Sequence, residues 1–149
     1  MIDEFWRSFL KDKGFNSNIE YTDSYYFGFD EKTANELLEL VLLGKKLATS
    51  SALISYELCS ENLPKIGDYN VITDFVGNPR CVIYTKNVRF IPFNEMTFEI
   101  CKSEGEDECL ETWREKHKKF FIEDGKELGY EFSEDMIVVF ENFEVVHKF

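Results

Sequence analysis

The segment YNVITDFVGNPRCVIYTKNV, residues 69–88, contains two β-rich runs separated by a turn sequence. Gly77-Asn78-Pro79 supplies the turn, because glycine and asparagine tolerate the left-handed conformations of tight turns and proline fixes φ. The runs on either side, Tyr69–Thr73 and Arg80–Val88, are rich in the β-branched and aromatic side chains that strands favour. The segment therefore predicts a β-hairpin, opened by Gly67-Asp68.

Further extended segments lie on both sides of this hairpin. The late segment Met136–Val146 is β-rich, and it alternates after Glu141, which predicts another strand of the same sheet. Near the start of the chain, the aromatic segment Tyr21–Phe29 predicts an extended piece.

Residues 1–13 carry apolar side chains at the spacing of an amphipathic helix. Burial of that apolar stripe is what stabilises such a helix, so we expect it to dock on the core of the same chain. An alternative is that the stripe containing Trp6 and Phe9 stays exposed and binds a partner protein.

A second helix is expected to begin after Asp30, a typical N-cap residue, and to end at Gly44, which suits a left-handed C-cap. Residues 95–102 are compatible with a short helix. Leu110, Trp113, His117, Phe120 and Phe121 then recur every three or four residues, which predicts a helix of about four turns that ends at Gly125 or Gly129. Together with the strands, these helices predict the α+β class.

Size and charge limit the organisation and the partners of the chain. At 149 residues, with 44% hydrophobic and 16% aromatic side chains, the chain is expected to form one domain, residues 1–149, with a sizeable core. The net charge of −12, from 29 acidic and 17 basic residues, disfavours binding to duplex DNA. Any nucleic acid would therefore have to be contacted locally, through an unpaired base.

The metal and membrane classes have no support in the sequence. The four cysteines form no CxxC pair and the two histidines lie far apart, so no metal site and no cofactor are predicted. No apolar run has the length of a membrane helix, and no secretory signal is recognisable. We expect a cytoplasmic protein with reduced thiols.

The segment Gly44-Lys45-Lys46-Leu47-Ala48-Thr49-Ser50-Ser51 concentrates two ammonium groups and three hydroxyls. Such groups bind an anion or a carbonyl oxygen, and a desolvated lysine can act as a base beside a hydroxyl nucleophile. The alternative is a glycine C-cap followed by solvated lysines, which are favourable at helix C-termini.

Two other segments are candidates for polar chemistry. The acidic run 103–108 offers a carboxylate for Lys46, or is a solvated loop before a helix. Trp113, Arg114 and His117 share a helix with Lys116, Lys118 and Lys119, so this helix could stack on and neutralise a nucleotide. The alternative is that Trp113 and His117 are core residues.

The Gly44–Thr49 segment matches the GxKxxT signature of the ASCH (ASC-1 homology) domain, and the chain resembles the longer bacterial members of that family from about residue 25 to 146. The blocks that agree are Tyr26-Phe27-Gly28-Phe29, Ser51-Ala52-Leu53, Leu63-Pro64-Lys65-Ile66-Gly67-Asp68-Tyr69, Pro92-Phe93-Asn94-Glu95, Ser103-Glu104-Gly105-Glu106, Trp113-Arg114, His117, Phe120-Phe121 and Phe132-Ser133-Glu134-Asp135-Met136-Ile137-Val138-Val139. The resemblance implies a small PUA-like mixed β-barrel flanked by helices, with a cleft beside the signature.

The resemblance also implies RNA binding or RNA processing. Some short members of the family are described as amidohydrolases of acetylated cytidine that use a lysine, a threonine and a glutamate, and others as ribonucleases. Carried over by motif, Lys46 is the base or activator, Thr49 the nucleophile or orienting hydroxyl, and Glu104 or Glu106 the carboxylate.

We therefore expect a pocket for a nucleobase, a nucleoside or single-stranded RNA, in which the same residues serve either binding or hydrolysis. Recognition alone needs polar groups that read the edges of a base and an aromatic platform on which the base stacks. The expected ligand-binding residues are Gly44, Lys45, Ser50, Ser51, Tyr56, Trp113 and Arg114.

Overall fold

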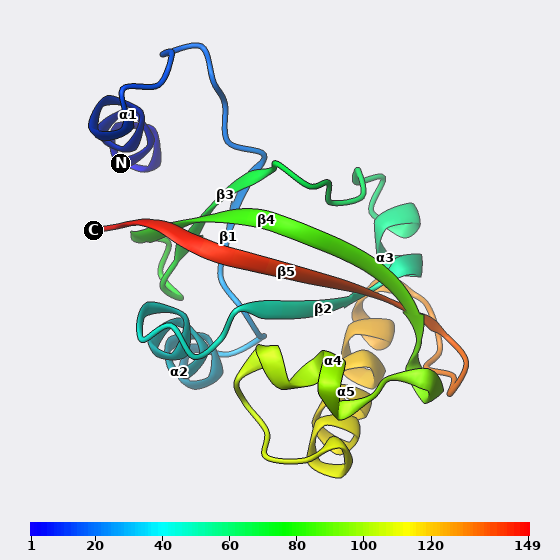
Figure 1. The fold of residues 1–149 in the computed structure, drawn as a ribbon. Helices are drawn as coiled ribbons and strands as arrows, with labels where there is room; N and C mark the ends of the chain where they lie inside the picture. Colours follow the sequence, from blue (N-terminus) through cyan, green and yellow to red (C-terminus); the bar gives the residue numbers. More distant parts are fainter.

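The computed structural model describes residues 1–149 and contains one five-stranded sheet in the order β1-β3-β4-β5-β2. The sheet curls into a half-barrel with helices around it (Figure 1). The parallel pair joins β1 (Asp23–Tyr25) to β3 (Tyr69–Thr73), and every other pairing is antiparallel. The predicted α+β class and the PUA-like curled sheet are confirmed.

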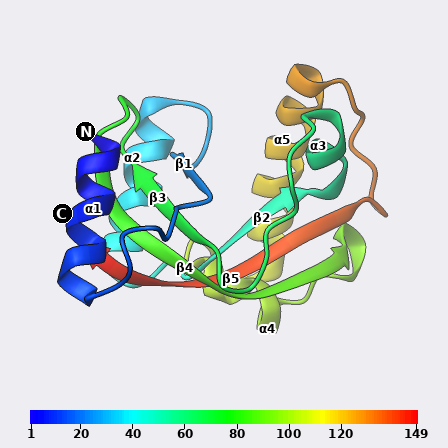
Figure 2. The same ribbon diagram turned by 90° about the horizontal axis from the view of Figure 1, so that it is seen from above.

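The hairpin of β3 and β4 forms where the sequence predicted it. Gly77 has a φ of 96°, and the Asp74 carboxylate accepts a hydrogen bond of 2.8 Å from the Asn78 amide. Strand β4 spans Pro79–Pro92 and is longer than predicted, because it pairs along most of its length with β5 (Ile137–Lys148). These two long strands form the centre of the sheet (Figure 2).

Helix α1 (Ile2–Lys13) docks on the sheet, as predicted. Its apolar stripe packs against Val71 and Val82, and the Trp6 Nε1 donates a hydrogen bond of 2.9 Å to the carbonyl of Ile19. Trp6 is 5% exposed and Phe9 is fully buried. The alternative that this stripe binds a partner protein is therefore wrong, because the chain itself covers it.

Helix α2 (Glu31–Leu42) has the predicted ends. The Asp30 carboxylate accepts from the Thr33 amide at 2.7 Å, and Gly44, with a φ of 76°, follows the C-cap residue Leu43. The extended segment before this helix is shorter than predicted, since only β1 pairs with a neighbour.

Strand β2 (Ala48–Ala52) and helix α3 (Leu53–Leu58) were not predicted. The strand sequence is Ala-Thr-Ser-Ser-Ala, which lacks the large β-branched and aromatic side chains on which strand prediction depends. It forms because β5 pairs with it from Ala48 to Ala52. Strand β2 is thus an edge of the sheet, directly after the signature segment.

The predicted helix at 95–102 is divided into three short turns, η1 (Phe93–Glu95), α4 (Phe98–Cys101) and η2 (Lys102–Glu104). Helix α5 (Leu110–Leu128) ends at Gly129, which has a φ of 96°. Gly125 lies inside the helix, where a side chain would collide with the carbonyl of Tyr130. None of the helices combines the length and apolar composition needed to cross a membrane.

Candidate functional site

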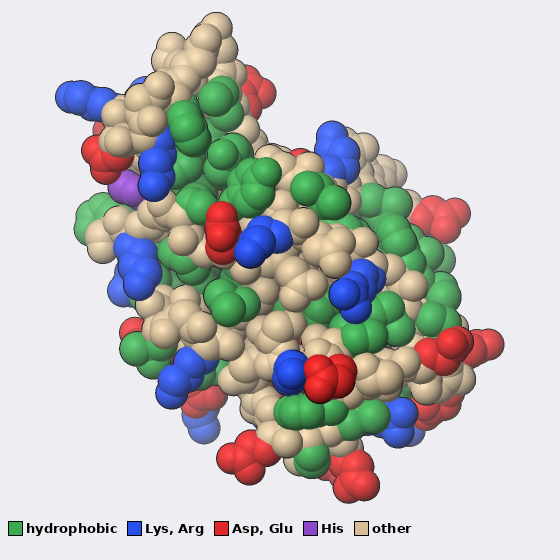
Figure 3. Space-filling model, in the orientation of Figure 1, with side chains coloured by type: hydrophobic (Ala, Val, Ile, Leu, Met, Phe, Trp, Pro, Cys, Tyr) green, Lys and Arg blue, Asp and Glu red, His purple; other side chains and the backbone are tan.

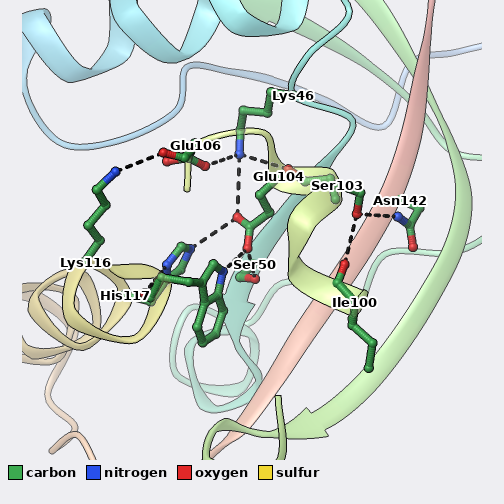
Figure 4. Close-up of polar contacts among 11 residues, drawn as sticks. Lys46, Ser50, Ile100, Ser103, Glu104, Glu106, Lys116, His117 and Asn142 are labelled. Atoms are coloured by element: carbon green, nitrogen blue, oxygen red, sulfur yellow. Dashed lines mark hydrogen bonds and ion pairs between the residues drawn. The ribbon is translucent and has the colours of Figure 1, made fainter. Parts of the chain in front are cut away.

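The backbone brings the signature segment against the acidic run 103–106. The Leu47 amide donates a hydrogen bond of 2.8 Å to the Ser103 carbonyl. Gly105 has a φ of 73°, and any side chain there would collide with the Lys45 carbonyl, so only glycine allows this close approach. Glu104 and Glu106 consequently lie beside Lys46 (Figure 4).

The Lys46 ammonium is buried between these two carboxylates. Its side chain is 1% exposed, and the Nζ atom donates to the Ala48 carbonyl at 2.9 Å and to Glu106 Oε2 at 2.8 Å. Glu104 Oε1 lies 3.6 Å from the same nitrogen. All three surrounding oxygens are acceptors, so the resting site holds Lys46 as an ammonium ion.

Glu104 has a complete set of donors around its carboxylate. Ser50 Oγ, at 2.9 Å, and Trp113 Nε1 donate to Oε2, while His117 Nε2 lies 3.2 Å from Oε1. Burial alone would raise the pKa of Glu104, but His117, Lys46 and the Trp113 hydrogen bond together lower it to about 2. Glu104 is therefore an anion over the whole physiological range.

His117 is the second cation of the network. Its Nδ1 atom lies 2.9 Å from the Trp113 carbonyl, which can only accept, and its Nε2 atom faces the Glu104 carboxylate. Both ring nitrogens are therefore donors, as in an imidazolium ion. Burial lowers the pKa of His117, but Glu104, Glu106 and the Trp113 carbonyl together raise it by more, so the net shift is upward. Two cations thus balance the charges of Glu104 and Glu106.

A cavity of about 710 Å³ opens beside this network. Helix α2 and the loop before it form one wall, α5 and residues 104–106 form the other, and Thr49 and Ser50 of β2 lie between them. The buried end of the cavity holds the network, whereas the rim includes the half-exposed Phe29 and the exposed Lys119. This volume suits a small organic ligand.

Five of the predicted site residues line the cavity: Lys46, Thr49, Ser50, Glu104 and Glu106. The family resemblance gave Glu104 and Glu106 as alternatives for the carboxylate of the site, and both of them contact Lys46. Thr49 lines the cavity but makes no side-chain hydrogen bond with Lys46 or Glu106. Thr49 and Ser50 are neighbours on the edge strand β2 and point to opposite faces, so the cavity lies at this edge of the sheet.

The other predicted ligand-binding residues lie outside the cavity. Gly44, Lys45 and Arg114 are exposed to solvent away from it. Ser51 Oγ is 2.7 Å from the Tyr56 hydroxyl, and burial raises the pKa of that tyrosine to about 12. Trp113 is fully buried in the core, as in the alternative that the sequence left open, and it contacts Glu104 instead of the cavity.

Three aromatic residues of the cavity, Phe27, Phe29 and Phe120, were not predicted as site residues. Phe27 lies under the Lys46 ammonium, 5.1 Å from Nζ to the ring centroid, and Phe29 stacks on Phe120 with centroids 4.8 Å apart. The sequence left His117 as a nucleotide-contacting or a core residue; it is buried, contacts Glu104 and also lines the cavity. Helical spacing predicted the buried face of the helix, but it could not show that this face contacts the segment that carries Glu104.

A second buried carboxylate, Glu141 of β5, lies on the opposite face of the sheet from Ser50 and Glu104. It is 6% exposed and pairs in register with Thr49. Burial raises its pKa to about 7, with a further contribution from Asp68. No group of three His, Cys, Asp or Glu side chains is arranged to hold a metal ion.

The curled sheet, the balanced ion network and the adjoining cavity define a small pocket-bearing α+β domain. The family model of the ASCH domain matches residues 23–147, and the chain belongs to this family. A comparison with curated protein sequences gives no match.

Solved structures support this assignment. A protein of Enterococcus faecalis is 33% identical, with a TM-score of 0.91 over 98% of this chain and 88% of that one. An ASCH domain of Lactobacillus crispatus is also 33% identical, with a TM-score of 0.84 over 97% of this chain and 92% of that one. An ASCH protein of Zymomonas mobilis, 14% identical with a TM-score of 0.50 over 82% of this chain and 67% of that one, shares the fold alone.

Proposed function

We propose that the chain binds a nucleobase or nucleoside, free or as an unpaired residue of RNA, in the cavity beside Lys46. The observation that carries this proposal is the mixture of donors and acceptors at the buried end. Lys46 supplies an ammonium there and Glu106 a carboxylate that is 15% exposed, and Thr49 of the adjoining strand adds a hydroxyl to the residues that line the cavity. Base edges carry both donors and acceptors, so a pocket that reads them needs both kinds of group.

Aromatic side chains line the same cavity. Phe27, Phe29 and Phe120 all contribute to its walls, and aromatic rings are the usual stacking partners of unpaired bases. The charge of the whole molecule supports a local contact. Lys and Arg side chains are interspersed with Asp and Glu on the face shown in Figure 3, without a continuous basic stripe, so a long duplex has no matching surface there.

Calorimetric titration of the four ribonucleosides and short single-stranded RNAs tests this proposal. Thr49→Val keeps the side-chain volume and removes the hydroxyl, and Glu106→Gln keeps the shape and removes the charge. Each change is expected to weaken binding about 10-fold, the equivalent of one lost charged or well-aligned hydrogen bond.

The matched control is Ser51→Ala, which removes a hydroxyl two residues from Thr49 but outside the cavity. This control should bind like the wild type. Wild-type protein that binds no nucleoside and no RNA would refute the proposal, and so would a Ser51→Ala variant as impaired as Thr49→Val.

A second candidate, hydrolysis of an acylated nucleoside, is favoured by the presence of Thr49, Lys46 and Glu106 in one cavity. In this reaction Thr49 Oγ attacks the acyl carbonyl and gives its proton to Glu106. The Lys46 ammonium stabilises the oxyanion, the leaving amine takes the proton, and water releases the acyl group from Thr49. Binding comes first because Thr49 has no hydrogen bond to a base in the resting site.

Turnover of acetylated cytidine, followed by chromatography, separates the two functions. A hydrolase should lose all turnover in Thr49→Val and keep part of it in Thr49→Ser. If the wild type binds the acetylated nucleoside without cleaving it, only the binding function stands. The same samples incubated with short RNA test for ribonuclease activity.

A further inference from the structure

The rim of the cavity on helix α5 carries two ammonium groups. Lys116 and Lys119 are three residues apart, so they lie on one side of the helix, and both line the cavity. Phe120, the next residue, stacks on Phe29 from the opposite wall, with an interplanar angle of 18°. The rim therefore combines cations with a flat apolar surface.

The two lysines differ in whether a carboxylate of the chain already neutralises their charge. Lys116 Nζ lies 3.1 Å from Asp107 Oδ1 and donates to the Glu106 carbonyl at 3.1 Å, so its charge is largely balanced by the buried Asp107 carboxylate. Lys119 forms no ion pair within 4.0 Å of a carboxylate. It is the uncompensated cation of the cavity.

An anionic group is disfavoured elsewhere in the cavity. At the buried end, Glu104 and Glu106 already balance Lys46 and His117, so an additional anion would meet two carboxylates. On the α2 wall, the lining residue with a charge is Glu36. A ligand with one negative group would therefore bind with that group at α5.

From this distribution we infer that the ligand is a nucleotide instead of a bare nucleoside, with its phosphate at Lys119, assisted by Lys116, and its base directed past Phe29 and Phe120 to the buried end. This inference rests on the proposed function. In a nucleotide the ribose holds the phosphate away from the base. This arrangement fits a cavity with the exposed Lys119 at its rim and the ion network at its buried end. With a net charge of −12 on the chain, a single phosphate group is favoured over a long polyanion.

Calorimetric titration with a nucleoside, its 5′-monophosphate, its 3′-monophosphate and a short single-stranded RNA tests the inference. The two monophosphates and the RNA distinguish a free nucleotide from a residue within a strand. In the wild type at low salt, at least one phosphorylated ligand should bind about 10-fold more tightly than the nucleoside, as expected for one charge-assisted hydrogen bond.

The decisive variants are Lys119→Met and, as a matched control, Lys118→Met. Lys118 is the neighbouring residue on the same helix, but it lies outside the cavity and approaches Glu134 at 3.8 Å. The ratio between nucleotide and nucleoside affinity should fall to about 2 or less in Lys119→Met and stay near the wild-type ratio in Lys118→Met. The salt dependence of nucleotide binding should also decrease in Lys119→Met alone.

Failure of this inference can be distinguished from failure of the proposed function. A wild-type protein that binds the nucleoside and the nucleotides equally would overturn the inference and leave the nucleoside pocket standing. Equal losses in Lys118→Met and Lys119→Met would overturn it as well, because they would indicate a general charge effect. A wild-type protein that binds none of these ligands would overturn both.

Discussion

Two buried carboxylates lie on either side of the edge strand β2, and their surroundings are opposite in character. Glu104 faces Ser50, Trp113, His117 and Lys46 and has its pKa lowered to about 2. Glu141 is paired in register with Thr49, one residue from Ser50, and has its pKa raised to about 7. Burial acts on both groups in the same direction, so their partners cause the difference.

The comparison shows how this domain keeps charge inside. Removal of a carboxylate from water is costly, and the cost is offset only where cations and hydrogen-bond donors surround the anion. Glu104 has two cations and two neutral donors within reach. Glu141 has no ion pair, and the negative charge of Asp68 further disfavours its ionised form. The first group stays ionised, and the second takes up a proton near neutral pH.

The largest expected effect comes from removing the central cation. Lys46→Met leaves the buried Glu104 and the partly buried Glu106 without the ammonium that lies between them, so we expect a loss of about 3–5 kcal/mol in the free energy of unfolding. Urea denaturation at pH 7 measures this value. A loss below about 1 kcal/mol would mean that the two carboxylates gain another partner or reach water.

The next largest effect is expected at Glu104 and depends on pH. Its pKa in the folded state lies below the ordinary 4.5, so its contribution to stability is present above pH 4.5 and is lost as the pH falls toward 2. Glu104→Gln should therefore be less stable than the wild type by about 3 kcal/mol at pH 6. The difference should shrink toward zero near pH 2, as measured by chemical denaturation across this range.

Glu141 should behave in the opposite way. Its pKa in the folded state lies above the ordinary 4.5, so its ionisation destabilises the fold as the pH rises through about 7. Glu141→Gln is expected to be as stable as the wild type at pH 4 and more stable by about 1–3 kcal/mol at pH 8. A variant that is less stable at pH 8 would contradict the view that this carboxylate lacks partners.

The smallest effect compares adjacent serines on the two faces of β2. Ser50→Ala removes a hydrogen bond to the ionised Glu104, and a loss of about 1.5–2 kcal/mol is expected. Ser51→Ala removes a hydrogen bond to the neutral Tyr56 hydroxyl, and a loss of about 0.5–1 kcal/mol is expected. Thermal denaturation of the two variants side by side gives the order, and a reversed order would contradict the assignment of the charged network to the Ser50 face.

Local patterns in the sequence predicted much of the fold. The Asp30 cap, the Gly44 helix end and the hairpin around Gly77 depend on a few neighbouring residues, and the structure has all three. Strand β2 escaped prediction because its small polar residues carry no strand preference, and only pairing with β5 makes it a strand. For Trp6 and Phe9 the sequence allowed two interpretations, packing on the core or binding of a partner protein. Only the tertiary structure shows the side chains of the sheet that cover them.

The sequence by itself determined the composition of the site: a lysine and hydroxyls after a helix end, a run of glutamates, and a helix with aromatic and basic residues. Tertiary structure alone decided which of these meet. The close approach at Gly105 brings Glu104 and Glu106 to Lys46 across about sixty residues of chain, and helix α5 adds His117. Since the charge state of a buried group depends on its neighbours in space, the opposite behaviour of Glu104 and Glu141 has no counterpart in local sequence.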